Sequence, residues 1–134
     1  MRGPRVAIVE DEAIIALHIA HALQAAGCAV LGCASSAAGA MRQVATACLA
    51  ETPPDVVLLD IQLKDMPDGI STAAVLREIC GEGLAVVFVT GFCDPETRRR
   101  AEALRPRAIY HKPFDISALV ASVLEANDSG QAAA

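Results

Sequence analysis

Residues 54–60 read Pro-Asp-Val-Val-Leu-Leu-Asp, a run of four large apolar side chains between two aspartates. An unbroken apolar run of this kind is typical of a parallel strand that is buried on both faces of its sheet. The prolines at positions 53 and 54 end any helix that precedes the run and favour extended backbone. We therefore predict a central strand over Asp55–Asp60.

Short apolar runs also recur on both sides of this segment. They predict four further strands, over Arg5–Val9, Cys28–Cys33, Leu84–Val89 and Ala108–Tyr110. Alanine-rich windows with apolar residues at helical spacing lie between them. These windows predict helices over Glu12–Ala26, from a cap at Ser35 or Ser36 to about Ala50, and over Ile70–Cys80, Pro95–Leu104 and Ile116–Ala126. Strands that alternate with helices indicate an α/β fold with a doubly wound, five-stranded parallel sheet and five helices.

Composition limits the classes of protein to which the chain can belong. It has 134 residues, 54% of them hydrophobic, and a formal net charge of −5. We expect one domain over residues 1–127 and a disordered tail over 128–134. The acidic balance and the absence of tryptophan argue against nucleic acid as a direct partner. No apolar run approaches the roughly 20 residues of a membrane span, and no signal peptide is visible, so we expect a cytoplasmic protein without a membrane partner.

Polar side chains follow four of the predicted strands. Glu10 and Asp11 follow the first, Asp60 ends the central one, and Thr90 and Lys112 follow the last two along the chain. In parallel α/β sheets, ligands bind just past the carboxyl ends of the strands. A single acid at such a place is more often a helix cap, but this combination predicts one shared site.

The charges of these residues indicate what the site binds. Three neighbouring carboxylates repel one another unless cations lie among them. Lys112 supplies one positive charge, and a hard divalent ion such as Mg²⁺, which prefers oxygen ligands, supplies two more. In such a pocket one carboxylate can act as a nucleophile toward a phosphoryl group, while the cations neutralise the transferring oxygens.

Four segments in this order and spacing resemble the response-regulator receiver domain, the phosphoacceptor module of bacterial two-component signalling. They are Val-Glu-Asp-Glu at 9–12, Pro-Asp-Val-Val-Leu-Leu-Asp at 54–60, Val-Thr-Gly at 89–91 and Lys-Pro-Phe at 112–114. The resemblance extends from about Arg5 to Ala126. It implies a flavodoxin-like receiver fold with strand order 2-1-3-4-5, an order for which one member of the family is a standard example.

The resemblance also implies a chemical role for each matching acid. Asp60 is expected to accept a phosphoryl group from the phosphohistidine of a sensor histidine kinase or a phosphotransfer protein. Asp11, Asp60 and the backbone carbonyl of Gln62 are expected to bind Mg²⁺, with Glu10 reaching the ion mostly through water. The resemblance therefore implies a phosphoprotein that catalyses only its own phosphotransfer and dephosphorylation, and no other enzyme activity.

The remaining matches concern the response to phosphorylation. Thr90 is expected to hydrogen-bond the phosphoryl group and Lys112 to pair with one of its oxygens, and the bond between Lys112 and Pro113 is expected to be cis. Many receivers carry an aromatic residue three positions before this lysine, but here that position is Ile109, and Tyr110 follows it. This departure puts the usual coupling between the threonine and an aromatic side chain in doubt.

Three features resemble the FATGUY subgroup of receivers, which are often single-domain proteins linked to stress signalling in alphaproteobacteria. They are Ile109 in place of the usual aromatic residue, a loop from Asp60 to Gly69 that is one residue longer than the common form, and the stretch Phe88–Phe92. Because the chain ends soon after the last predicted helix, we expect output through a downstream protein. The chain is then a monomer, or a dimer that forms on phosphorylation, unless it is a fragment of a longer regulator.

Other functions stay open alongside this hypothesis. An aspartate-nucleophile phosphatase or phosphotransferase usually needs a second acid two residues after the nucleophile, and that position is Gln62. A receiver that binds partners without phosphorylation would explain Ile109 but not the intact acidic set. A flavodoxin-type cofactor binder is disfavoured because no glycine-rich loop follows the first strand.

The arginine cluster and the cysteines each have a functional interpretation that the sequence does not favour. The arginines at 98–100, 105 and 107 concentrate positive charge near the fourth predicted helix, where a solvated or partner-facing surface is more common than a nucleic-acid patch. The five cysteines are odd in number and include no Cys-x-x-Cys pair. This favours reduced thiols that fill small spaces in the core over a metal site or a disulfide.

Overall fold

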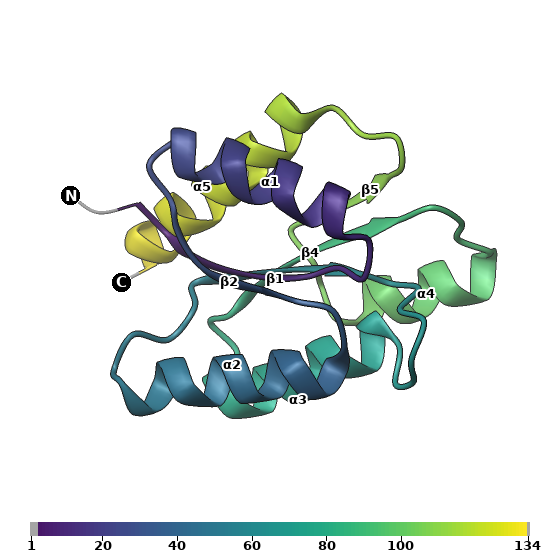
Figure 1. The fold of residues 1–134 in the computed structure, drawn as a ribbon, viewed down its shortest axis with the longest axis horizontal. Coiled ribbons are helices and arrows are strands. Elements are labelled where there is room, and N and C mark those ends of the chain that lie inside the picture. Colours follow the sequence, from purple (N-terminus) through teal and green to yellow (C-terminus); the bar gives the residue numbers. More distant parts are fainter. Residues whose placement is uncertain (1–2, 134) are drawn as a thin grey trace.

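The computed structural model describes the backbone of residues 3–133 and the side chains of residues 3–125. Within this part of the chain, one sheet of parallel strands has the order β2-β1-β3-β4-β5, which confirms the predicted topology (Figure 1). In chain order the elements are β1 (Arg5–Val9), α1 (Ala13–Ala25), β2 (Ala29–Ala34), α2 (Ala37–Leu49), β3 (Val56–Asp60), α3 (Gly69–Cys80), β4 (Ala85–Thr90), α4 (Pro95–Ala103), β5 (Ala108–His111) and α5 (Ile116–Ala133).

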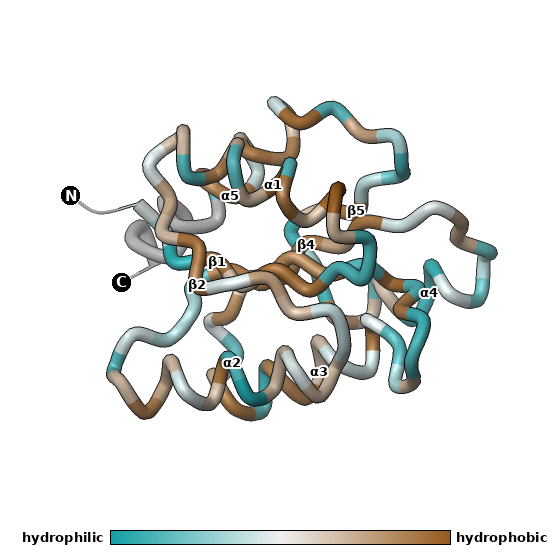
Figure 2. Tube along the Cα trace, viewed as in Figure 1, coloured by the Kyte–Doolittle hydropathy of each residue, from teal (hydrophilic) through white to brown (hydrophobic). Residues whose placement is uncertain are grey.

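Each face of the sheet carries its own layer of helices. Helices α1 and α5 cover one face, and α2, α3 and α4 cover the other (Figure 1). A hydrophobic core lies on each face of the sheet, and alternate residues of each inner strand belong to one core or the other. In β1, Val6 and Ile8 face α1 and α5, whereas Ala7 and Val9 face α2. Hydrophobic segments gather along the strands between these layers (Figure 2). All five residues of β3 are buried, which confirms the predicted central strand.

Side-chain caps fix the start of three helices. Ser36, Asp68 and Asp94 each accept a hydrogen bond from the backbone N–H three positions later, at 3.2, 2.8 and 2.7 Å. Such caps satisfy donors that have no partner within the helix. Because the helices run antiparallel to the strands, these starts lie near the carboxyl edge of the sheet, where the predicted site residues follow their strands.

The observed boundaries differ from the predicted ones by small amounts. Helix α5 continues to Ala133, beyond the end predicted at Ala126. Side chains from Ala126 onward lie outside the described residues, so the tail expected over 128–134 stays a prediction. Within the described residues, no helix is both long and apolar enough to cross a bilayer.

The loop after β3 leaves the sheet and returns to it at one place. The Ile61 N–H donates to the Val89 carbonyl at 3.0 Å, and the Gly69 N–H donates to the Ile61 carbonyl at 2.9 Å. A Cβ atom at position 69 would lie 2.0 Å from the Asp60 carbonyl oxygen, so only glycine allows this approach. These contacts hold both ends of the loop next to Asp60.

Candidate functional site

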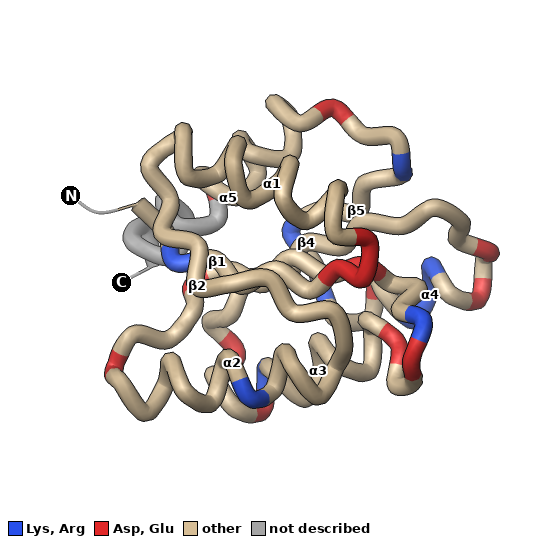
Figure 3. Tube along the Cα trace, in the orientation of Figure 1, with Lys and Arg blue, Asp and Glu red and all other residues tan. Residues whose placement is uncertain are grey.

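The carboxyl edge of the sheet brings together residues from four strands. Glu10 follows β1, Asp60 ends β3, Thr90 ends β4 and Lys112 follows β5. The first three are buried, with 2%, 3% and 0% of their surfaces exposed. In Figure 3 the acidic segment after β1 forms a red band at this edge. The convergence that the sequence predicted is therefore present in the fold.

Lys112 lies at the centre of the site. Its ammonium nitrogen is 2.9 Å from Glu10 Oε1, 3.0 Å from Asp60 Oδ2 and 3.2 Å from Glu12 Oε1. Only 14% of the Lys112 side chain is exposed. Burial alone lowers the pKa of Lys112, but hydrogen bonds to Glu10 and Asp60 outweigh burial and raise it. Lys112 is therefore fully charged at neutral pH.

Glu10 pairs with Lys112 from a buried position. Its side chain has no exposed surface, and burial, the largest influence, raises the pKa of its carboxyl group. Hydrogen bonds from Lys112 and from the Glu12 N–H, the latter 3.0 Å long, act in the opposite direction. The net effect is a raised pKa, as expected for an acid next to a second carboxylate in a partly dry pocket.

Backbone donors orient the other two acids. The Gln62 N–H donates to Asp60 Oδ1 at 2.9 Å, and the Lys64 N–H donates to Asp11 Oδ2 at 2.8 Å. With Lys112 on Asp60 Oδ2, both oxygens of the Asp60 carboxylate are held by protein donors. Both backbone donors belong to the loop after β3, so this loop sets the direction of each carboxylate.

Four carboxylates and one ammonium form a possible cation site. Oxygen atoms that lie within 4.8 Å of one another come from Glu10, Asp11, Glu12 and Asp60. Asp11, Glu12 and Asp60 line a cleft of about 430 Å³ together with Gln62, Lys64, Gly91 and Lys112, and the buried Glu10 lies behind this lining. Lys112 offsets only one of the negative charges, and an all-oxygen donor set with excess negative charge fits Mg²⁺. The sequence did not single out Glu12, although the acidic run 10–12 was a signal for it.

Thr90 is engaged by the loop after β3. Its hydroxyl lies 2.5 Å from Gln62 Oε1 and 2.6 Å from the Phe92 carbonyl oxygen, and it can donate to one of them at a time. The Gln62 side-chain amide also donates to the Phe92 carbonyl. The sequence predicted a backbone role for Gln62 and missed this side-chain contact, because a spacing of 28 residues carries no local signal.

A family model described as the response regulator receiver domain matches residues 6–124 of the chain. The chain belongs to this family. The transcriptional regulatory protein PdtaR of Mycobacterium tuberculosis is 33% identical over 121 residues, which are 89% of this chain and 54% of that protein. This receiver domain therefore spans about half the length of the curated relative that it matches.

Solved receiver structures share the fold over nearly the whole chain. The signal receiver domain of a modulated diguanylate cyclase from Desulfovibrio desulfuricans G20 is 32% identical, with a TM-score of 0.83 and 98% of each chain covered. A response regulator receiver protein from Sinorhizobium medicae WSM419 is 27% identical, with a TM-score of 0.79 and 96% of this chain and 97% of that chain covered. The receiver fold expected from the sequence motifs is thus confirmed.

The bond between Lys112 and Pro113, which follows β5, is cis, as the resemblance implied. Met66–Pro67, in the loop after β3, is a second cis bond and was not predicted.

The two apolar residues in the middle of β5 point to opposite faces of the sheet. Ile109 packs with the core on the α4 side, and the neighbouring Tyr110 lies on the opposite face. There the Tyr110 hydroxyl donates to the Ala118 carbonyl of α5 at 3.0 Å and contacts the Ser122 hydroxyl. Tyr110 therefore does not replace the aromatic residue that many receivers carry at position 109.

The arginines around α4 are paired with acids at the surface. The ion pairs are Arg98–Glu102 at 2.7 Å, Arg99–Glu96 at 3.2 Å, Arg100–Asp68 at 3.2 Å and Arg105–Glu82 at 3.6 Å. Their positive charge is therefore largely compensated within the domain. This arrangement matches the solvated surface that the sequence favoured over a nucleic-acid patch.

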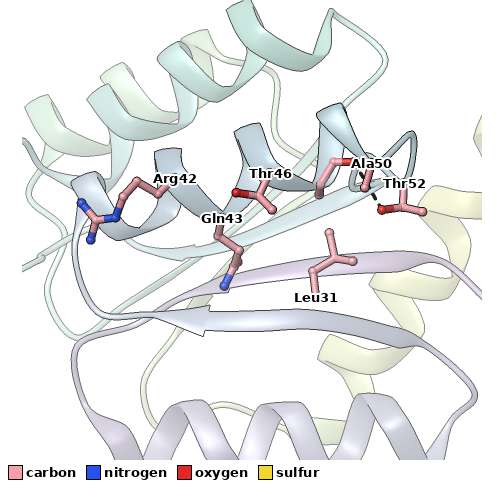
Figure 4. Close-up of a pocket in the computed structure, with 7 residues that line it drawn as sticks. Leu31, Arg42, Gln43, Thr46, Ala50 and Thr52 are labelled. Atoms are coloured by element: carbon pink, nitrogen blue, oxygen red, sulfur yellow. Dashed lines mark hydrogen bonds between the residues drawn. The ribbon is translucent and has the colours of Figure 1, made fainter.

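A second cavity lies between β2 and α2, away from the acids. It has a volume of about 440 Å³, and Gln43 points into it from α2 opposite Leu31 of β2 (Figure 4). The Gln43 side-chain carbonyl oxygen is buried without a hydrogen-bond partner among the described residues. No carboxylate lines this cavity within the described part of the chain, so it lacks the oxygen ligands that make the acidic cleft a candidate cation site.

Proposed function

We propose that this receiver domain is the phosphoacceptor of a two-component pathway and that Asp60 accepts the phosphoryl group. The observation that carries the proposal is the pair of donors on Asp60. Lys112 holds one carboxylate oxygen at 3.0 Å and the Gln62 N–H holds the other at 2.9 Å, in a cleft rich in carboxylates. This arrangement fixes a buried nucleophile and leaves a cation next to the oxygens that would arrive with phosphorus.

The reaction moves a phosphoryl group from nitrogen to oxygen. An oxygen of Asp60 forms the new bond to phosphorus while the bond to the imidazole nitrogen of a phosphohistidine breaks, and the bonding electrons stay with that nitrogen. Asp11, Asp60 and the Gln62 carbonyl would hold Mg²⁺, with Glu10 contributing through water. The bound ion supplies positive charge that offsets the phosphoryl oxygens.

Thr90 and Lys112 would respond to the modified aspartate. Lys112 can turn from the Asp60 carboxylate to a phosphoryl oxygen without leaving the cleft. The Thr90 hydroxyl must first give up its contact with Gln62 or Phe92. The Gln62 side chain therefore sets part of the free-energy cost of the conformational change, and partner binding follows the populations of the two states.

The phosphate donor would dock next to the cleft. Helix α1 exposes Ile14 and Leu17, which are 83% and 67% accessible. An apolar groove of about 260 Å³ lies beside them, lined by Ile14, Ile15, His18, Lys112, Pro113 and Phe114. Lys112 lines both this groove and the acidic cleft. We propose that the histidine kinase or phosphotransfer protein covers this apolar surface and thereby presents its phosphohistidine to Asp60.

Phosphorylation with a small donor tests the proposal. The chain is incubated with acetyl phosphate and Mg²⁺, and its mass is measured. We expect one phosphoryl group per chain, none on Asp60→Asn, and full modification of Asp65→Asn, a matched change at an exposed loop residue. Equal labelling of Asp60→Asn and the parent would contradict the assignment.

A chromogenic phosphate ester separates the phosphoacceptor from the phosphatase hypothesis. A phosphoacceptor takes up a single group per site, whereas an aspartate-nucleophile phosphatase would turn over many ester molecules. We propose that the chain is a phosphoacceptor, since the neutral amide of Gln62 is too weak an acid and too weak a base to act as a general acid or base. Output through a downstream protein, the FATGUY subgroup and a cytoplasmic location stay predictions from the sequence.

A further inference from the structure

Two of the cysteines form a close pair at the opposite end of the domain from the cleft. The Sγ atoms of Cys48 and Cys80 lie 4.0 Å apart, although the residues are 32 positions apart in the sequence. Cys48 stands in the last turn of α2, and Cys80 is the last residue of α3. These helices lie side by side on one face of the sheet, with their C-terminal ends at the amino edge of the strands (Figure 1).

The pair lies at the surface of the molecule. Both cysteines are half-buried against the core of the α2–α3 face. Both residues keep part of their surface exposed, and their chain neighbours Leu49 and Ile79 are 87% and 43% exposed, so this end of the two helices is open to solvent. Cys28 is buried among the residues of the α1–α5 core, on the other side of the sheet.

We propose that Cys48 and Cys80 are a dithiol modification site that a low-molecular-weight disulfide, such as oxidised glutathione, converts to an intramolecular disulfide. One cysteine thiolate attacks the oxidant, forms a mixed disulfide and releases one glutathione. The second cysteine thiolate then attacks the protein sulfur of that mixed disulfide and releases the other glutathione. Two protein thiols are oxidised, one glutathione disulfide is reduced, and the two thiol protons end on the released glutathione molecules.

The geometry allows this bond with little movement. A disulfide has an S–S length of about 2.05 Å, so the two sulfurs, which lie 4.0 Å apart, must approach by about 2 Å. Burial, followed by the nearby Cys48, raises the pKa of Cys80 to about 12. Cys80 is thus a thiol at neutral pH, and the formation of the bond is expected to accelerate as the pH rises, because the thiolate is the attacking species.

The disulfide would join two helices of one layer. It would close a loop of 32 positions, which restricts the unfolded chain more than the folded one. We expect the midpoint of thermal unfolding to rise by roughly 10 °C on oxidation. The proposal does not depend on phosphorylation of Asp60, because the two sites lie at opposite edges of the sheet.

Oxidation of the full chain with oxidised glutathione at pH 8 tests the proposal. We expect the monomer to lose about 2 Da, a Cys48–Cys80 peptide to appear on digestion without reduction, and dithiothreitol to reverse both changes. Cys33→Ala, at an exposed cysteine, should leave all three results unchanged. Cys48→Ala and Cys80→Ala should each give a glutathione adduct instead, and either variant suffices if the other fails to fold.

Three results would contradict the proposed disulfide. Separate glutathione adducts on Cys48 and Cys80 without the linked peptide would overturn the proposal, as would linkage of either residue to Cys33 or Cys93. Full retention of both thiols would also overturn it, provided that the urea-unfolded chain reacts under the same conditions.

Discussion

Lys112 and the arginines of α4 are both surrounded by carboxylates, but their settings differ. The Lys112 side chain is 14% exposed, and the acids that contact it come from the end of β3 and from the turn between β1 and α1. Arg99 and its partner Glu96 are 72% and 74% exposed and lie within one helical turn. The first arrangement requires the whole fold, whereas the second requires only a helix. Charges that pair within one helix therefore mark a solvated surface here, whereas charges that meet from the ends of different strands mark the site.

The largest expected effect comes from removing the buried cation. Lys112→Met leaves Glu10 and Asp60 without their shared partner. Loss of one member of a buried ion pair costs about 3–5 kcal/mol, and we expect about 2–3 kcal/mol here because the cleft is open to water. Urea unfolding in metal-free buffer measures the change in the free energy of unfolding.

A matched substitution and added metal sharpen this test. Lys64→Met removes an exposed ammonium at the rim of the cleft and should change stability by less than about 0.5 kcal/mol. Added Mg²⁺ should restore more stability to Lys112→Met than to the parent, because the ion replaces the lost charge. Equal losses in both lysine variants would remove the distinction between buried and exposed charge.

Asp68 combines features of the two clusters, and its replacement should lower the free energy of unfolding by an intermediate amount. Its side chain caps α3 and also pairs with Arg100 of α4 at 3.2 Å. Asp68→Ala should cost about 1–2 kcal/mol, mostly through the lost cap. Arg100→Ala keeps the cap and should cost less than half as much, which unfolding of the two variants can compare.

The pH dependence of Asp68 provides a second measurement. Burial raises the pKa of Asp68, but hydrogen bonds from the Ser71 N–H and from Arg100 outweigh burial, and the pKa falls below its ordinary value of 3.8. The folded state therefore binds this proton less readily than the unfolded chain. Its contribution to stability is complete above about pH 3.8 and is lost as the pH falls through the lowered pKa. The difference between the parent and Asp68→Ala should shrink there, and a constant difference down to pH 3 would contradict this assignment.

The contact between the Gln62 side chain and Thr90 carries no charge, and its loss should change a free energy by less than the substitutions above. Gln62→Ala keeps the backbone carbonyl of residue 62 and removes one of the two acceptors that the Thr90 hydroxyl contacts. We expect beryllium fluoride, a phosphoryl mimic, to bind about five-fold more tightly, which corresponds to one lost hydrogen bond of about 1 kcal/mol. Calorimetric titration in Mg²⁺ measures this, with Gln43→Ala on α2 as the control. Unchanged or weaker binding would show that Gln62 does not hold Thr90 back.

Replacement of an exposed arginine of α4 should change the free energy of unfolding least. Arg99→Ala breaks a pair that is largely exposed on both sides, and such pairs contribute about 0–1 kcal/mol. We expect a loss below about 0.5 kcal/mol that disappears in high salt, as measured by urea unfolding with and without 1 M sodium chloride. A loss as large as that of Lys112→Met would break the comparison.

The fold and the edge of the site could be predicted because both depend on patterns within single segments. The apolar run 56–59 is buried on both faces, and the acids and the lysine that follow the strands meet as parallel strands require. The cis bond at Pro113 came from the family resemblance and is confirmed. The roles of the acids, of Thr90 and of Lys112 in phosphorylation stay predictions.

The missed contacts depend on side-chain directions between distant segments. Glu12 reaches Lys112 across 100 positions, and Gln62 reaches Thr90 across 28. Cys48 and Cys80 meet only because α2 and α3 pack side by side with their ends aligned. A sequence pattern specifies which face of a helix is apolar, but it does not specify which residues of two helices become neighbours.

The anchored base of the loop after β3 has a consequence for engineering. Both ends of the segment 62–68 are tied to Ile61, and Gly69 lets the backbone close there. Residues added at the exposed tip near Asp65 would lengthen the excursion, while the contacts at its base keep Asp60 in place. This tip is a natural insertion point for an epitope or a fluorophore that reports on the cleft.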